Sequence, residues 1–307
     1  MNYKFFLSLT FIIFVGFLLI FYWFFPLNTI EFGEFNISPK NYNFSEGVND
    51  NLKMQFYPNM RYQDKDILYN IDSSCNLQKK NDMVRAFETL SNITILKFYP
   101  TEIDEEIMVT CDEKTKIEGE LFVAGEGGPT NASKIGEKYI IFKGKILLIK
   151  KSECERPNIA IHELLHALGF DHSSNKNNIM YNITKCSQTI GDDIPKLINE
   201  IYSEQPLPDL SFENVSATIK GRYLNTEIII RNIGLKDSPK FKIIIYTDGK
   251  DIKEFEIDSL NIGYGTTISI QNLFISQIST EKLEYEIKAD FQEFDKENNR
   301  IALEIKK

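Results

Sequence analysis

All three histidines of this 307-residue chain lie within eleven positions, in the run IHELLHALGFDHS. They are His162, His166 and His172, and Glu163 directly follows the first of them. On a helix, His162 and His166 lie one turn apart on the same face, so both imidazoles can bind one metal ion at about 2.0–2.1 Å. Gly169 can end that helix and turn the chain back, which lets His172 complete the ligand set. The spacing therefore predicts a metal bound by three imidazoles, with a fourth position left for water.

This ligand set is typical of a catalytic zinc, because a structural zinc is closed by four protein ligands. A catalytic zinc lowers the pKa of its water and polarises a peptide carbonyl. Glu163 is rotated about 100° from His162 around the helix, so it can reach the water without binding the metal. It can then accept the proton of the water and return it to the leaving amine. HExxH alone also arises by accident on amphipathic helices, but Gly169 and His172 make the match specific.

This stretch and the residues after it resemble the metzincin zinc peptidases, in particular the matrixins of peptidase family M10. HELLHALGFDHS has the matrixin form of the motif, including Ser173 after the third histidine. NIMY at residues 178–181 resembles the Met-turn, and DDI at residues 192–194 resembles the start of the last matrixin helix. The resemblance covers roughly residues 60–202. It implies an endopeptidase for polypeptide substrates with one catalytic Zn²⁺ bound by the three histidines.

The same resemblance implies that Met180 supports the metal site from beneath and that the substrate lies extended beside an edge strand. Four residues are candidates for the substrate pocket: Tyr181, Asn182, Leu121 and Val123. Asn182 replaces the proline usual after the Met-turn tyrosine, which leaves the wall of the S1′ pocket undefined. Because Tyr181 directly follows Met180, the tyrosine fifth ligand of the astacins is not expected.

Further matrixin features have no counterpart in the sequence. No histidine is left for a second, structural zinc. Bound calcium would be possible, but no convincing calcium loop in the sequence indicates it. No cysteine-switch segment of the PRCGxPD type precedes the domain, so latency by that thiol is not implied.

The residues ahead of the motif predict the elements that position it. Strand patterns occur at residues 67–72, 95–99, 107–111 and 119–124. A helix capped by Ser74 or Asn76 is expected to run to about Leu90. The glycines at 125–128 break the strand pattern, and Lys143-Gly144 predicts a tight turn between two paired strands.

The active-site helix is expected after Pro157, and a last helix from Asp192 to about Tyr202. With the metzincin resemblance, these elements give the fold class α+β: a twisted mixed sheet with the active-site helix and a C-terminal helix. QPLPDL at residues 205–210 is the expected domain boundary, because two prolines stop the helix.

Beyond this boundary the chain predicts an all-β immunoglobulin-like sandwich of seven or so short strands. The run at 241–257 alternates around Asp248-Gly249, which is a strong hairpin signal. LPDL, IRNIGLKDSP and DFQEFDKENNRIALEI resemble the CARDB family of extracellular adhesion-type modules. The resemblance implies contacts with surface proteins or glycans and gives no catalytic residue.

Residues 5–25 carry no charge and as a helix would be about 31 Å long, enough to cross a membrane. We expect an uncleaved single-pass anchor, since the run is long for a signal peptide and no small-x-small cleavage site follows. A cleaved signal, giving a secreted protein, is the alternative. Lys4 before the span and Glu31 and Glu34 after it place the remaining chain outside the cell.

The predicted domains are therefore a transmembrane segment at 1–30, a spacer at 31–60, the peptidase domain at 61–204 and the sandwich at 205–307. The net charge of the chain is −9, and the only charge in its first 30 residues is that of Lys4. The remaining chain is acidic, which argues against a nucleic acid as partner.

The cysteines are even in number and show no CxxC spacing, so an exported chain would most simply form two disulfides. We favour Cys154 with Cys186, because they bracket the histidine helix and the turn after it. This leaves Cys75 with Cys111. Four free buried thiols are the alternative.

Two functions fit these residues. The first is a membrane-anchored zinc endopeptidase acting outside the cell. The second is a surface adhesion or peptide-binding protein whose metal site has little turnover. The intact Glu163 favours the enzyme, since a binding protein needs no general base.

Overall fold

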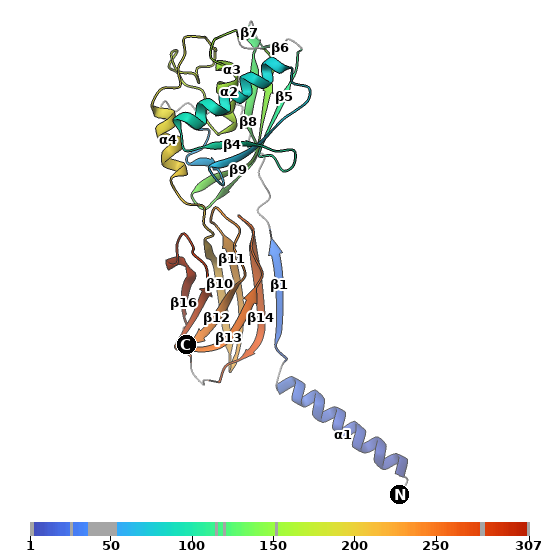
Figure 1. The fold of residues 1–307 in the computed structure, drawn as a ribbon. Helices are drawn as coiled ribbons and strands as arrows, with labels where there is room; N and C mark the ends of the chain where they lie inside the picture. The colour runs from blue at the N-terminus through green and yellow to red at the C-terminus, as the bar shows by residue number, and fades with distance from the viewer. Residues whose placement is uncertain are drawn as a thin grey trace. The chain divides into compact units, whose positions relative to one another are not determined.

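The computed structural model describes residues 3–24, 27–35, 54–113, 116–118, 121–150, 153–276 and 280–305. The chain forms two compact units (Figure 1). The histidine unit comprises Ile37–Pro208 and Ile233–Lys236. The sandwich unit comprises Met1–Asn36, Asp209–Asn232 and Asp237–Lys307.

The histidine unit is built on a six-stranded mixed sheet (Figure 1), in which β9 pairs with three strands, β2, β5 and β8. Its strands are β2 (Met60–Tyr62), β3 (Asp66–Ile71), β4 (Lys97–Pro100), β5 (Ile107–Cys111), β8 (Gly125–Ile135) and β9 (Lys138–Leu148). The order is β2-β9-β5-β3-β4, with these strands parallel, and β8 pairs antiparallel with β9. β6 (Lys116–Glu118) and β7 (Leu121–Val123) form a separate small sheet.

In its described part, this unit also contains the helices α2 (Leu77–Ile93), α3 (Asn158–Ala167) and α4 (Asp193–Tyr202). Asn76 caps α2, because its side-chain oxygen accepts a hydrogen bond from the Lys79 backbone N–H at 3.0 Å. Gly169 follows α3 with a φ of +92°, which confirms the turn predicted there. α2 and α3 contact each other, and α3 also lies along β8 and β9. The α+β class and the helices are thus as predicted.

Two glycine segments behave differently from the prediction. The turn predicted at Lys143-Gly144 is wrong, because β9 runs through both residues and the turn lies at Gly136, with a φ of +57°. A Cβ on Gly144 would lie 2.3 Å from the Tyr62 hydroxyl oxygen, so this glycine allows a close approach. The break predicted at 125–128 is also wrong, since these residues lie in β8.

Both predicted disulfides are present in the histidine unit. Cys75 pairs with Cys111 and ties the start of α2 to the end of β5. Cys154 pairs with Cys186 and ties the segment before α3 to the loop after the third histidine. All four cysteines of the chain are therefore paired.

The sandwich unit consists of two four-stranded antiparallel sheets. One contains β1 (Thr29–Phe35), β14 (Gly265–Phe274), β11 (Tyr223–Asn232) and β10 (Leu210–Lys220), in this order. The other contains β13 (Lys250–Ile257), β12 (Phe241–Thr247), β15 (Lys282–Lys288) and β16 (Arg300–Glu304), preceded by a short helix at Glu297–Asn299. The Asp248-Gly249 hairpin is confirmed, since both residues have the positive φ that such a turn requires.

The first strand of the sandwich was not predicted. β1 pairs with β14 from Thr29 opposite Gln271 to Phe35 opposite Gly265. The region after residue 205 supplies seven strands, as expected, and β1 is an eighth that precedes the histidine unit in the chain. The spacer predicted at 31–60 therefore begins with a paired strand, and its residues 36–53 lie outside the described part.

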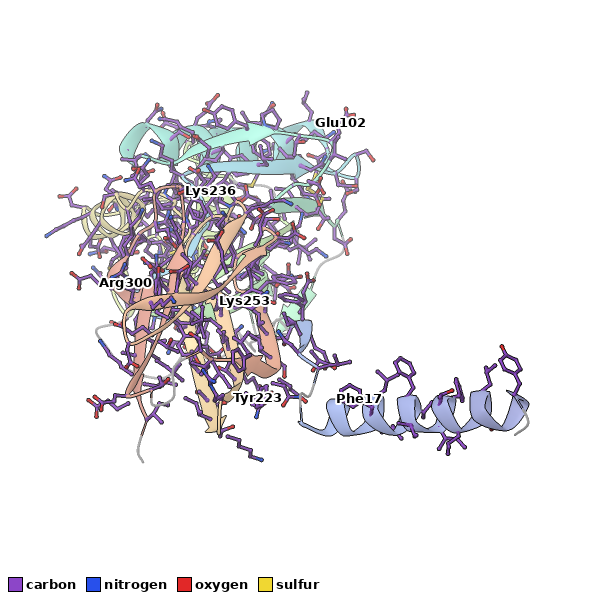
Figure 2. The ribbon with its side chains drawn as sticks, turned by 90° about the horizontal axis from the view of Figure 1, so that it is seen from below. Phe17, Glu102, Tyr223, Lys236, Lys253 and Arg300 are labelled. Atoms are coloured by element: carbon purple, nitrogen blue, oxygen red, sulfur yellow. A yellow bond between two sulfur atoms is a disulfide. The ribbon has the colours of Figure 1, made fainter. Side chains whose placement is uncertain are left out.

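The remaining helix, α1 (Tyr3–Phe24), contains Phe17, whose side chain projects from it and is 62% exposed (Figure 2). Within the described part of the chain, no helix meets the length and the hydropathy that a membrane span needs. The membrane anchor therefore stays a prediction.

Candidate active site

The three predicted ligands converge at the end of α3. Nε2 of His166 lies 3.0 Å from Nε2 of His162 and 3.2 Å from Nε2 of His172. Two nitrogens that each bind a tetrahedral zinc at 2.0–2.1 Å lie about 3.3 Å apart. Among the described residues, this is the one group of three or more potential ligands close enough to hold a metal. The spacing therefore fits a single zinc ion.

The hydrogen bonds of two imidazoles also fit a metal. Because a carbonyl oxygen only accepts, Nδ1 of His162 donates to Ile179 at 2.7 Å, and Nδ1 of His166 donates to Phe170 at 2.8 Å. Burial lowers the pKa of His162 to about 4 and that of His166 to about 3, so both rings are neutral. Their Nε2 atoms thus carry lone pairs at a separation that favours a cation between them.

The third ligand is more exposed and is held through its neighbours. The backbone N–H of His172 donates to the Asp171 carboxylate at 2.7 Å. The next residue, Ser173, donates its N–H to the Met180 carbonyl at 2.8 Å. The segment that carries His172 is therefore joined directly to the predicted Met-turn.

Met180 itself is buried in the core of the histidine unit. The Asn178 side-chain oxygen accepts a hydrogen bond from the Met180 N–H at 2.8 Å. Ile179 lies between these two residues, and its carbonyl oxygen accepts the hydrogen bond from Nδ1 of His162. The loop thus orients one ligand through its backbone, while Met180 fills the core beside it.

Glu163 lies on α3 between two ligands and is only 6% exposed. Burial raises the pKa of its carboxyl to about 8, and the charge of Glu126 on β8 adds to this shift. A dication nearby favours the charged carboxylate and opposes the shift. The side chain faces β8, so it sits between the strand and the helix.

The predicted pocket residues are only partly brought together. Tyr181 is half-buried and Asn182 is exposed, directly after the Met-turn. Val123 is half-buried in β7, and Leu121 lies in the same strand, with a side chain outside the described set. β7 pairs with β6, whereas the strand along α3 is β8, so the pocket role of these residues stays a prediction.

The segment before β2 also contacts the site, which the sequence did not predict. The Phe56 ring stacks on His166 with centroids 5.8 Å apart, and its backbone N–H donates to the Gly169 carbonyl at 2.9 Å. The Asp171 N–H donates to the Met54 carbonyl at 3.0 Å. The segment has no periodic pattern, and its run of aromatic and apolar side chains was the only available signal.

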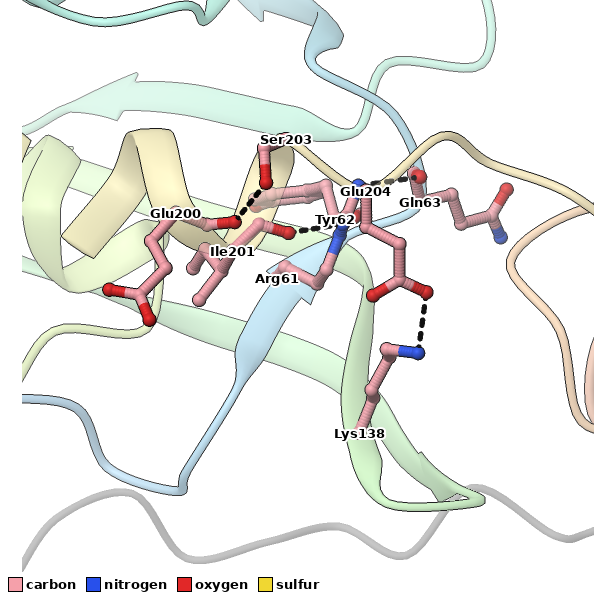
Figure 3. A network of polar contacts seen from close by, with 8 residues as sticks. All are labelled: Arg61, Tyr62, Gln63, Lys138, Glu200, Ile201, Ser203 and Glu204. Atoms are coloured by element: carbon pink, nitrogen blue, oxygen red, sulfur yellow. Dashed lines mark hydrogen bonds and ion pairs between the residues drawn. The ribbon is translucent and has the colours of Figure 1, made fainter. Parts of the chain in front are cut away.

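A polar network joins β2 to the end of α4 (Figure 3), and a further hydrogen bond joins β2 to α3. Arg61 is 1% exposed and donates to the Ile201 carbonyl at the end of α4, with its guanidinium 4.5 Å from the centre of the Tyr202 ring. The Tyr62 N–H donates to the Tyr202 hydroxyl at 2.8 Å, and the Tyr62 hydroxyl donates to the Ala167 carbonyl at 3.1 Å. The last residue of α3 is thereby fixed to the sheet.

Two protein families match parts of the chain. Residues 54–196 match the Astacin family (peptidase family M12, subfamily A), and residues 207–302 match CARDB. The matches support a metzincin-type zinc peptidase domain followed by a CARDB domain. The matrixin subtype is not supported, because the matching peptidase family is M12 and not M10. That expectation rested on a few positions, such as Ser173, whereas the match extends over the domain.

Many solved structures are similar to parts of the chain, and three of them illustrate the likeness. The CARDB domain of a Pyrococcus furiosus protein, in complex with di-metal ions, is 15% identical over 32% of this chain and 87% of that chain, with a TM-score of 0.28. A domain of a putative cell surface protein from Methanosarcina acetivorans is 19% identical over 31% and 88%, also with a TM-score of 0.28.

The third is high choriolytic enzyme 1, a hatching enzyme zinc-protease from the medaka fish Oryzias latipes. It is 22% identical over 36% of this chain and 46% of that chain, with a TM-score of 0.24. A search of the curated proteins found no match.

Proposed function

We propose that the chain is a zinc-dependent metalloendopeptidase that hydrolyses peptide bonds of protein substrates, with Glu163 as general base and acid. The convergence of three Nε2 atoms on one point, next to a buried glutamate on the same helix, carries this proposal. The match of residues 54–196 to a zinc peptidase family supports it independently.

Each residue then has a defined task. His162, His166 and His172 hold the ion, and the carbonyls of Ile179 and Phe170 fix two of the rings. When bound, the zinc ion acts as a Lewis acid that acidifies water and polarises the scissile carbonyl. A carboxylate oxygen of Glu163 accepts a proton from the attacking water and then donates it to the leaving amine nitrogen.

The substrate pocket and the location are further parts of the proposal. Tyr181, Asn182, Leu121 and Val123 remain candidates for contacts that select the cleaved sequence. Two disulfides support an exported protein, because disulfides persist in oxidising compartments. The uncharged run at residues 5–25, which extends past the described helix, supports the further proposal that the N-terminal segment anchors the chain in the cell membrane. Both domains would then lie outside, with the CARDB domain available to surface proteins or glycans.

A second function, binding of peptides with little turnover, would use the same metal site. Both can be tested with the full chain, oxidised and loaded with zinc, incubated with a mixed peptide library and analysed by mass spectrometry. We expect cleavage within peptides, which stops when a chelator removes zinc and returns when zinc is added. Peptides retained by the protein without cleavage would support the binding function. If the peptides are neither cleaved nor retained, both functions are contradicted.

A further inference from the structure

Three glycines near the start of β8 have no conformational reason to be glycine. Gly125, Gly127 and Gly128 lie in a regular strand paired with β9. None of them is among the residues with a positive φ, so their backbone is open to any side chain. What distinguishes them is the space that a side chain would have to enter.

The three positions differ in what a Cβ atom would meet. On Gly125, it would lie 2.7 Å from Cγ and 2.9 Å from Oε1 of Glu163. On Gly127, it would lie 2.2 Å from the backbone oxygen of Glu163. On Gly128, it would meet nothing within 4 Å. Side chains two residues apart on a strand point to the same face, so positions 125 and 127 both face the general base.

The strand has little room to retreat from the helix at this point. Gly125 is paired with Leu148 of β9, which is buried. The preceding residue, Ala124, accepts hydrogen bonds from the N–H groups of Ile149 at 3.0 Å and Lys150 at 2.8 Å. On the other side, α3 is buried along most of its length. An added Cβ at 125 would therefore displace the Glu163 side chain rather than the strand.

We propose that Gly125 is a positioning residue for Glu163: its missing side chain leaves the space that the catalytic carboxylate occupies. Gly127 has another task, because the atom it faces belongs to the backbone of α3 and cannot rotate away. Gly127 lets the strand approach the helix, whereas Gly125 determines where the carboxylate lies. This inference rests on the proposed function of Glu163.

Alanine at each glycine separates these roles in the full chain. We expect Gly125→Ala to lower kcat on the order of a hundredfold, as a displacement of about 1 Å can do, with KM, zinc content and Tm unchanged. Gly128→Ala is the matched control and should keep the wild-type kcat. Gly127→Ala should lower the Tm, because backbone must move. Internally quenched peptides report the rates, and calorimetry reports the Tm.

A double variant tests whether Gly125 acts through Glu163. Glu163→Ala removes the atoms that Gly125 faces, so Gly125→Ala should not lower the residual activity of that variant any further. The inference is overturned if Gly125→Ala is as active as Gly128→Ala, or if Gly125→Ala has a lower zinc content or a lower Tm than the wild type, as a structural variant would. It is also overturned if Gly125→Ala still lowers the activity of the Glu163→Ala variant. Wild-type activity in Glu163→Ala would instead contradict the proposed function itself.

Discussion

At the scale of single residues, the site depends on groups that hold the ligands as much as on the ligands. Backbone carbonyls of Ile179 and Phe170 fix the tautomers of two histidines. One of these carbonyls belongs to a loop that the Asn178 side chain stabilises. The motif alone predicts the ligands and Glu163, because their spacing is local. It cannot predict Phe56 or Gly125, which reach the site through tertiary packing.

Asn178→Ala should weaken zinc binding by about tenfold without removing a ligand, since partners of the ligands tune metal affinity by such factors. The substitution leaves the Met180 N–H without its acceptor. It thereby loosens the Ile179 carbonyl, which accepts the hydrogen bond from His162. Competition with a chromophoric chelator measures the affinity. Asn177→Ala, at an exposed neighbouring position, is the control and should bind zinc as the wild type does. Equal affinities for both variants would show that the loop does not orient His162.

At the scale of elements, the sequence predicts helices better than glycine-containing strands. α2 and α4 lie where caps and apolar spacing placed them. Gly144 suggested a turn and the glycines at 125–128 a break in the strand, but all of them lie inside strands, and another group comes close to Gly125, Gly127 and Gly144. A glycine that provides room looks the same in a sequence as a glycine that provides a turn. Only the packing of Tyr62 or Glu163 against the strand distinguishes the two.

The two sheets of the sandwich are joined by a hydrogen bond between two buried hydroxyls, and one of these hydroxyls, that of Tyr285, ionises at high pH. The Thr226 hydroxyl on β11 donates to the Ser216 carbonyl, so the Tyr285 hydroxyl on β15 donates to Thr226 at 2.8 Å. Burial raises the pKa of Tyr285 from 10.0 to about 12. Since the folded pKa lies above the unfolded one, this contribution to stability is complete below pH 10.

As the pH rises from 10 to 12, the sandwich should lose about 2–3 kcal/mol through Tyr285, because two pKa units correspond to that free energy. Denaturant unfolding at a series of pH values measures the change. Tyr285→Phe should lose less stability over the same range, since its ring cannot ionise. An identical pH dependence in the variant would contradict the assignment.

At the scale of the whole molecule, the sandwich is discontinuous in sequence. Its edge strand β1 precedes the histidine unit, and the other seven strands follow residue 208. The CARDB match covers only residues 207–302 and does not include β1. Glu31 and Glu34 obscure the strand pattern of this short segment, and its pairing with β14 is a long-range contact that no local pattern encodes.

Removal of residues 1–35 should therefore destabilise the sandwich, because it leaves the β14 edge unpaired. Calorimetry should show a lower Tm for the sandwich transition and an unchanged transition for the histidine unit. Removal of residues 1–24, which spares β1, is the control and should leave the sandwich Tm unchanged. If both truncations behave alike, β1 does not contribute to the fold of this domain.

In the proposed function, Glu163 performs proton transfer at a zinc held by three histidines. The most direct test is kcat/KM for Glu163→Gln and for the wild type at equal zinc content. The amide keeps the shape of the side chain but cannot accept the proton. We predict about one zinc per chain in both proteins and a fall in kcat/KM of about 10²–10⁴-fold in the variant. Equal kcat/KM in the two proteins would contradict the account.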